Sequence, residues 1–291
     1  MKRQKRKLDG IDIASIVILT ASVLLIVFPF YTSLVTSFAT SASYLRKPVQ
    51  LFPESFTLGN YRYVLTHLAI LDGYKNTMLV VGVGTVISMS ISLMFSYGLA
   101  MRNYPGKKIA FLFLLITMYF SGGLIPTYML IRNLNLINNP MAIVFLCGVS
   151  PFNIIIMKNG MDALPQELSE AARIDGAGEG RIFVEIIIPL IKPIVVTFTL
   201  FTAVAYWNEW YWSMIILTRG ENKTLQVMLR DVVTSIDAAS LESMGSVEGM
   251  NVFSQGLKMA AVMITMLPIM LVYPFVQKHF TKGILVGAVK M

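Results

Sequence analysis

Long apolar runs separated by short polar segments dominate the sequence. Each run is about 20 residues long or longer, which is the length that an α-helix needs to cross the hydrocarbon core of a bilayer. Six such runs cover residues 11–38, 74–101, 109–131, 140–157, 190–217 and 256–276. The pattern predicts an all-α membrane protein whose six transmembrane helices form a single domain over residues 1–291.

The composition also favours a chain that lies in lipid. Hydrophobic residues make up 55% of the sequence and charged residues 14%, whereas soluble domains carry about 25% charged residues. The mean hydropathy is +0.67. The first run follows the basic segment 2–7 and is longer than the roughly 7 to 15 apolar residues of a signal peptide. We therefore expect it to be retained as the first span.

The distribution of Lys and Arg predicts the orientation. Six spans place both termini and the polar segment 158–185 on the same side of the membrane. That side holds fifteen of the 24 Lys and Arg residues. Because cytoplasmic loops carry the excess of these residues, we expect cytoplasmic N- and C-termini. The net charge of +8 then requires no nucleic-acid partner.

No catalytic or metal-binding pattern accompanies the spans. The sequence lacks the phosphate-binding pattern Gly-x4-Gly-Lys-Ser/Thr, so we do not expect the chain to bind ATP. No arrangement of Ser, His and an acid suits hydrolysis. Cys147 has no second thiol, and His67 and His279 lie far apart. We expect no enzyme activity, no metal and no cofactor.

A polar segment at residues 165–189, between the fourth and fifth spans, has the features of a short helix, a turn and a second helix. Pro165 suits the first turn of a helix, and acidic residues follow it. Gly176 can adopt the left-handed conformation that ends a helix. The small side chains of Ala171 and Ala172 give the first helix a face that another protein can approach closely.

The spacing in this segment resembles the cytoplasmic signature loop of binding-protein-dependent (MetI-like) permeases of ABC importers. The matching residues are Glu170, Ala171, Ala172, Gly176, Ile186, Ile188 and Pro189. The family more often has Leu where Ile188 stands, which is an exchange of one apolar residue for another. The resemblance implies that the loop is a coupling helix that docks on an ATPase. The coupling residues that it implies are Glu170, Ala171, Ala172, Asp175, Gly176 and Pro189.

Three further segments are similar to the carbohydrate-uptake (maltose-type) members of that family. They are residues 125–138, 207–210 and 223–227. The resemblance implies a permease that imports a sugar or oligosaccharide. Its expected partners are two cytoplasmic ATP-binding subunits, a second permease, usually a different chain, and an external sugar-binding protein.

One charged residue stands out inside a predicted span. Glu209 lies in the outer half of the run 190–217, and a carboxylate against lipid is costly. Aromatic rings stack on sugars while amides and carboxylates pair with hydroxyls, so we name Trp207, Asn208, Glu209 and Trp210 as a candidate substrate pathway. In an equal alternative, these residues belong to an aromatic belt at the membrane interface, and Glu209 lies near the headgroups or bonds to a neighbouring helix. In a continuous helix, Trp207 and Trp210 would share roughly one face, with Glu209 displaced by about 100°.

The alternative function is a secondary transporter driven by an ion gradient. Such a transporter should show repeated halves and ionisable residues near the middle of the membrane. The sequence offers Glu209 but no evident repeat. The importer permease is therefore the favoured interpretation.

Overall fold

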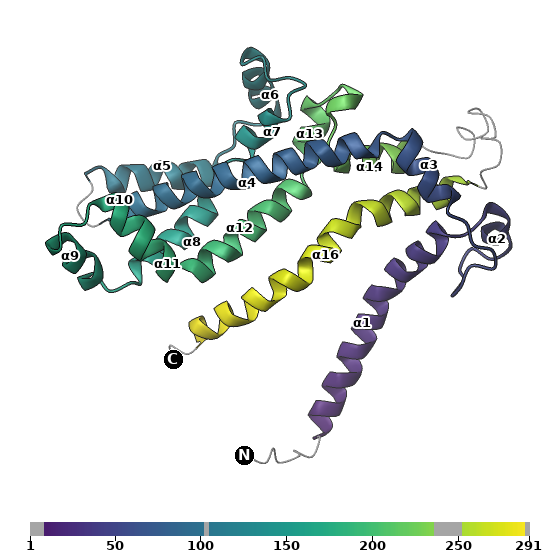
Figure 1. Ribbon diagram of the computed structural model, residues 1–291, viewed down its shortest axis with the longest axis horizontal. Coiled ribbons are helices and arrows are strands. Elements are labelled where there is room, and N and C mark those ends of the chain that lie inside the picture. The colour runs from purple at the N-terminus through teal and green to yellow at the C-terminus, as the bar shows by residue number, and fades with distance from the viewer. Residues whose placement is uncertain (1–8, 102–104, 236–251, 289–291) are drawn as a thin grey trace. The chain divides into compact units, whose positions relative to one another are not determined.

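The computed structural model describes residues 9–101, 105–235 and 252–288, and for residues 273 and 275–288 it gives only the backbone. The chain divides into two units. The first comprises Met1–Leu68 and Leu229–Met266, and the second comprises Ala69–Met228 and Leu267–Met291. Every residue assigned above to the coupling loop or to the candidate pathway lies in the second unit (Figure 1).

The first unit begins with the apolar helix α1. Its helices are α1 (Gly10–Ser37), α2 (Ser41–Arg46) and α3 (Gly59–His67). Asp9 and Asp12 form a capping box at the start of α1, which satisfies backbone N–H groups that a helix start leaves free. Apart from Val35 near its end, the large apolar side chains of α1 stay accessible along the helix, as lipid contact requires. The buried Asn60 amide holds the end of α1 by donating to the carbonyls of Ser37 and Ala39, at 3.0 and 3.2 Å.

The second unit contains most of the remaining helices. They are α4 (Ile70–Ala100), α5 (Lys107–Tyr119), α6 (Leu124–Asn133), α7 (Met141–Leu146), α8 (Pro151–Asp162), α9 (Glu167–Ile174), α10 (Glu179–Arg181), the π-helix η1 (Ile182–Ile187), α11 (Ile188–Leu190), α12 (Lys192–Trp207), α13 (Tyr211–Ile216) and the 3₁₀ turn η2 (Gly220–Asn222). Two helices extend across the division, α14 (Leu225–Ser235) and α16 (Ser254–Ala288). Within the described ranges the only pairing of β type is one bridge between Ala39 and Phe56, so the predicted all-α class is confirmed.

Helix α4 is the element on which the second unit packs. It contacts α5, α7, α8, α12 and η2. Its buried face carries several small residues, among them Gly84, Ser88, Ser92 and Ser96, which let neighbouring backbones approach closely. The Ser96 hydroxyl donates to the carbonyl of Ile154 on α8 at 2.9 Å. Polar side chains inside this apolar unit thus serve helix packing.

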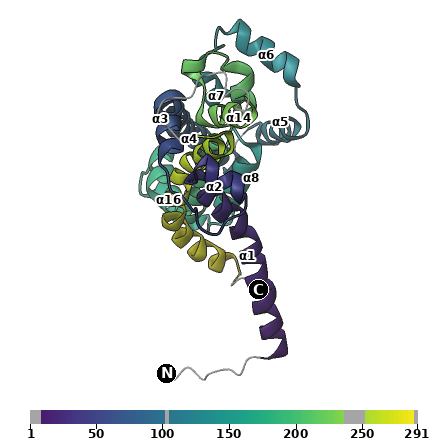
Figure 2. The same cartoon turned by 90° about the vertical axis from the view of Figure 1, so that its right-hand side faces the viewer.

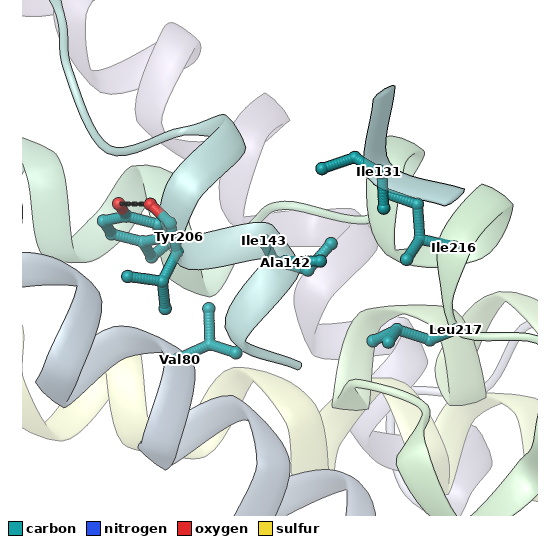
Figure 3. Close-up of a cluster of buried hydrophobic side chains, with 8 residues drawn as sticks. Val80, Ile131, Ala142, Ile143, Tyr206, Ile216 and Leu217 are labelled. Carbon is teal, nitrogen blue, oxygen red and sulfur yellow. Dashed lines mark hydrogen bonds between the residues drawn. The ribbon is translucent and has the colours of Figure 1, made fainter. Parts of the chain in front are cut away.

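An apolar cluster joins α4 to the helices that follow it. Figure 3 shows Tyr206 from α12 beside Val80 from α4, with its hydroxyl directed at the backbone of α7. That hydroxyl donates to the carbonyl of Val144 at 3.0 Å. Ile216 and Leu217 belong to the same cluster and are fully buried. The Tyr206 ring is therefore fixed at both its face and its polar end.

By length and apolarity, the described residues contain three candidate membrane spans, or five if each of two bent helix pairs forms one span. Helices α1, α4 and the Ser254–Val272 part of α16 are long and apolar enough to cross. Two further candidates are bent pairs. The first pair, Lys107–Tyr119 and Leu124–Asn133, is bent by 112°. Figure 2 shows these two helices, α5 and α6, running in different directions. Glu179–Leu190 and Lys192–Ile216 meet at 84°.

The predicted fourth span, residues 140–157, consists of two short helices. Helix α7 has 6 residues and α8 has 12. The chain breaks between them where Gly148 lies close to the carbonyl of Val144, and α8 then starts at Pro151 with a Ser150 cap. Proline and glycine favour such a break. The count of six spans, their boundaries and the single domain stay predictions.

We predict that Gly84→Ala destabilises the protein. A Cβ atom at position 84 would lie 2.7 Å from the fixed ring of Tyr206, and overpacking of this kind costs about 1–3 kcal/mol. Thermal unfolding in detergent should show a lower Tm. Gly82→Ala is the matched control, because a Cβ there meets nothing within 4 Å. Equal Tm values for the two variants would contradict the packing described.

Candidate functional site

The predicted coupling helix is α9, which ends in a glycine turn. Gly176 has φ +85°, so the left-handed conformation expected there is confirmed. The N–H of Gly176 donates to the carbonyl of Arg173 at 3.0 Å, and the N–H of Ala177 donates to that of Ala172 at 2.9 Å. This pair of bonds is a Schellman motif. The start differs from expectation, because Pro165 precedes the helix rather than lying in its first turn.

The residues assigned to coupling do not share one environment. Glu170, Ala171, Asp175 and Gly176 are exposed, whereas Ala172 is half-buried. Ala172 packs against the apolar cluster that includes Ile182, so it anchors α9 inward. The exposed side of α9 is therefore the part that is free to meet a partner.

Two apolar side chains on α9 escaped the sequence analysis. Ile174 is 86% exposed and Leu168 is 42% exposed. An amphipathic helix normally buries its apolar residues, so an isoleucine left open beside Asp175 is unusual in a helix of this kind. The alternation of apolar and charged residues in Glu167–Ile174 was the signal available.

Pro189 lies beyond α9, where the helix geometry changes. The π-helix η1 precedes it, and the N–H of Ile188 donates to the carbonyl of Phe183, five residues back. Pro189 has no N–H, so it cannot satisfy a carbonyl in the preceding turn. The 84° bend follows directly, between Leu190 and Lys192. π-Helices of this length are rare and often mark functional sites.

An ion pair closes the turn after α9. Nε of Arg173 lies 2.7 Å from Oε1 of Glu179, the first residue of α10. The hydrogen bond to this carboxylate raises the pKa of the Arg173 guanidinium. The same bond lowers the pKa of the Glu179 carboxyl below its ordinary value, so both partners are charged at neutral pH.

The candidate pathway residues are not brought together as a helical face. Helix α12 ends at Trp207 and α13 begins at Tyr211, so the expectation that Trp207 and Trp210 share one face is wrong. Trp207 is 5% exposed and packs edge-on against Tyr74, with 6.2 Å between ring centroids, whereas Trp210 is 45% exposed. The cause is a helix break that the aromatic run does not signal.

Glu209 forms that break and caps the next helix. Its carboxylate accepts from the N–H of Trp212 at 2.7 Å and from the N–H of Ser213 at 3.1 Å. The Ser213 hydroxyl donates to the same carboxylate at 2.6 Å. Backbone N–H groups at a helix start favour a negative charge. Both carboxylate oxygens are thus held by the start of α13, the next helix along the chain.

Glu209 also lines a cavity of about 390 Å³. The other lining residues are Ser88, Cys147, Ser150, Asn153, Phe201, Thr202, Ala205 and Tyr206. Asn153 donates to the Thr202 hydroxyl at 3.2 Å. A volume of this order suits a small ligand. The lining surface is mainly apolar, because the Asn153 amide and the Tyr206 hydroxyl are bonded within the protein. Asn208 is not among the lining residues; it is exposed and donates to the carbonyl of Val204 at 3.0 Å.

Asn138 organises the loop that follows α13. It has φ +60°, which asparagine tolerates better than most residues. Its Oδ1 accepts from the backbone N–H groups of Thr218 and Arg219, at 2.8 and 2.9 Å. Its own N–H donates to the carbonyl of Ile216 at 3.1 Å. Sequence reasoning missed this role because the partners lie about eighty residues away.

These features define an integral membrane protein with an exposed helix-turn-helix loop. The chain belongs to the family of binding-protein-dependent transport system inner membrane components, which it matches over residues 86–286. This match contains the whole segment 165–189. The protein is a permease subunit of an ABC importer, and the ion-gradient-driven alternative finds no support.

Similar proteins extend the match to almost the whole chain. Protein LplC of Bacillus subtilis (strain 168) is 35% identical over 279 residues, which are 96% of this chain and 94% of LplC. The polygalacturonan/rhamnogalacturonan transport system permease protein YtcP of the same organism is 36% identical over 92% of this chain and 93% of its own. The crystal structure of a bacterial ABC transporter involved in the import of the acidic polysaccharide alginate contains a chain that is 28% identical, with a TM-score of 0.88. The likeness covers 96% of this chain and 100% of that chain.

We predict that Gly176→Val abolishes transport. A left-handed conformation costs a residue with a Cβ atom about 1–2 kcal/mol, and a β-branched side chain is tolerated least, so the turn after α9 would be lost. Uptake by the reconstituted importer should fall while the amount of permease in the membrane is unchanged.

Gly178→Val is the matched control for this prediction. Gly178 has φ −72° and ψ 161°, which suit valine, and a Cβ there meets nothing within 4 Å. Equal transport by the two variants would show that the turn is unnecessary.

Proposed function

We propose that this permease imports an oligosaccharide handed over by an external sugar-binding protein. The observation that carries the proposal is α9, an exposed helix with unburied apolar residues, set in a chain of the importer family. The proposed assembly contains two cytoplasmic ATP-binding subunits and a second permease chain. The chain lies in the bacterial inner membrane with both termini in the cytoplasm, in keeping with the distribution of Lys and Arg.

The ATPase contact is proposed for the exposed side of α9. Glu170 and Asp175 offer charge, Ala171 permits close approach, and Ile174 supplies an apolar side chain that docking would remove from water. Ala172, Gly176 and Pro189 act differently in this proposal. Ala172 anchors α9, Gly176 ends it, and Pro189 lies at the bend that follows.

The substrate class is proposed from the relatives. YtcP is named for polygalacturonan and rhamnogalacturonan, and the structural neighbour for acidic alginate. We therefore propose oligosaccharides that contain uronic acids. The carboxylate of Glu209 does not oppose an anionic sugar strongly, because α13 already holds it with three hydrogen-bond donors.

The proposal predicts ATP-dependent uptake of uronic-acid oligosaccharides. Proteoliposomes with the complete importer should accumulate labelled oligogalacturonides only when the binding protein and ATP are both present. A neutral malto-oligosaccharide serves as the control substrate. Accumulation driven by a proton or sodium gradient without ATP would contradict the importer mechanism. Uptake of the neutral sugar alone would contradict the substrate class.

We further predict that Glu209→Gln lowers both stability and uptake. The amide keeps one acceptor oxygen but loses the charge, and a lost cap costs about 0.5–2 kcal/mol. Tm in detergent should fall by a few degrees, and sugar uptake should fall with it because the residue lines the cavity. Trp207→Ala is unsuitable as a comparison, since removing a buried tryptophan costs about 3–5 kcal/mol by itself.

Glu221→Gln provides the control for Glu209. Glu221 is an exposed acid in η2, so the charge changes equally without loss of a cap. A lower Tm with unchanged uptake would assign Glu209 to capping alone. If Tm and uptake were both unchanged in Glu209→Gln, Glu209 would have no role in the cavity or in the cap.

A further inference from the structure

The carboxylate of Glu179 bridges two elements that are far apart in sequence. Its Oε2 accepts a hydrogen bond from the hydroxyl of Tyr97 at 2.6 Å. Its Oε1 accepts one from Nε of Arg173 at 2.7 Å. Tyr97 lies in the last turn of α4 and Arg173 lies on α9. One side chain therefore connects the proposed ATPase-docking helix with the end of the central helix of the second unit.

Apolar packing accompanies the bridge, because Tyr97 of α4 and Ala172 of α9 contact the same apolar cluster around Ile182. The ring of Tyr97 packs against that of Phe183, with centroids 4.8 Å apart. On the other side a cavity of about 160 Å³ separates parts of α4 from α9, and both Tyr97 and Arg173 line it. The space between the two helices is incompletely filled beside Tyr97 and Arg173. The polar bridge therefore adds a directional connection to the apolar cluster that both helices contact.

A second ion pair in the same loop provides a comparison. Arg181 and Glu185 lie four residues apart, and their side chains meet at 2.8 Å. This pair connects neighbouring turns of one helical segment. Exposed pairs of this kind contribute little. The Arg173 and Glu179 pair is also partly exposed, but the Tyr97 hydroxyl extends it across 82 positions of sequence.

The coupling loop is connected to the rest of the second unit in two ways, along the chain to α12 and through Glu179 to α4. These two routes differ in stiffness. The route along the chain passes through η1 and the 84° bend before it reaches α12. A π-helix and a bend are places where rotation can be absorbed. The route through Glu179 reaches α4, one continuous helix of 31 residues. Movement that enters α4 at its last turn is carried along the full length of that helix.

We propose that Glu179 is a positioning residue that fastens the coupling loop to α4, so that displacement of α9 by the ATPases moves α4 with it. This inference rests on the proposed function of α9. The Tyr97 hydroxyl on α4 donates one hydrogen bond to the Glu179 carboxylate, and Arg173 on α9 donates the other and orients that carboxylate. Loss of the bridge would leave α9 and α4 connected through the shared apolar cluster, whose contacts are not directional.

The test uses the complete importer in proteoliposomes with oligogalacturonide as the transported sugar. Tyr97→Phe keeps the ring and its packing on Phe183 but removes the hydroxyl, and Glu179→Gln removes the charge. Each variant should lower sugar uptake per ATP hydrolysed several-fold. The double variant should be no worse than either single one, because both remove the same connection. Glu185→Gln is the matched control and should leave the ratio unchanged.

Three outcomes would overturn the proposal. They are a wild-type ratio in Tyr97→Phe, effects that add in the double variant, and an equal loss in Glu185→Gln. Failure of the proposed function looks different, because the wild-type permease would then fail to retain the ATPases or to take up sugar at all. Tm in detergent separates the result from misfolding, since Tyr97→Phe should unfold at the wild-type temperature.

Discussion

The close approach of α12 to α4 at Gly84 is the contact on which the second unit depends. Tyr206 lies over the glycine, and its hydroxyl reaches the backbone of α7. One ring thereby fixes the positions of three helices. The serines along the same face of α4 continue this contact toward α8. In lipid, where apolar surface gains little from burial, small residues and buried hydrogen bonds supply the packing that a soluble protein obtains from its core.

The parts of the fold that local chemistry dictates were predictable. The apolar runs predicted the class, and Gly176 predicted the turn because its left-handed conformation is a property of the residue. The break after Trp207 was not predictable in this way. Its cause is the capping of α13 by Glu209, and an aromatic run with one acid is equally compatible with a continuous helix. Asn138 is a similar case, since its acceptor role depends on a distant loop.

The two carboxylates singled out by the structure are stabilised by different means. Glu209 receives hydrogen bonds from the start of a helix, so its negative charge has local compensation. Glu179 receives one bond from a guanidinium and one from a phenol that belongs to another helix. The first arrangement fixes a kink within one segment. The second connects segments, which makes its geometry sensitive to their relative movement.

The π-helix in front of Pro189 has a consequence for the evolution of this loop. A π-turn contains one residue more than an α-turn, and each residue of an α-helix turns its neighbours by about 100°. Deleting one residue from Ile182–Ile187 would restore α-helical geometry and rotate α9 about the axis of the segment. The length of this segment therefore sets the direction in which the docking face points, and insertions or deletions there are less tolerable than substitutions.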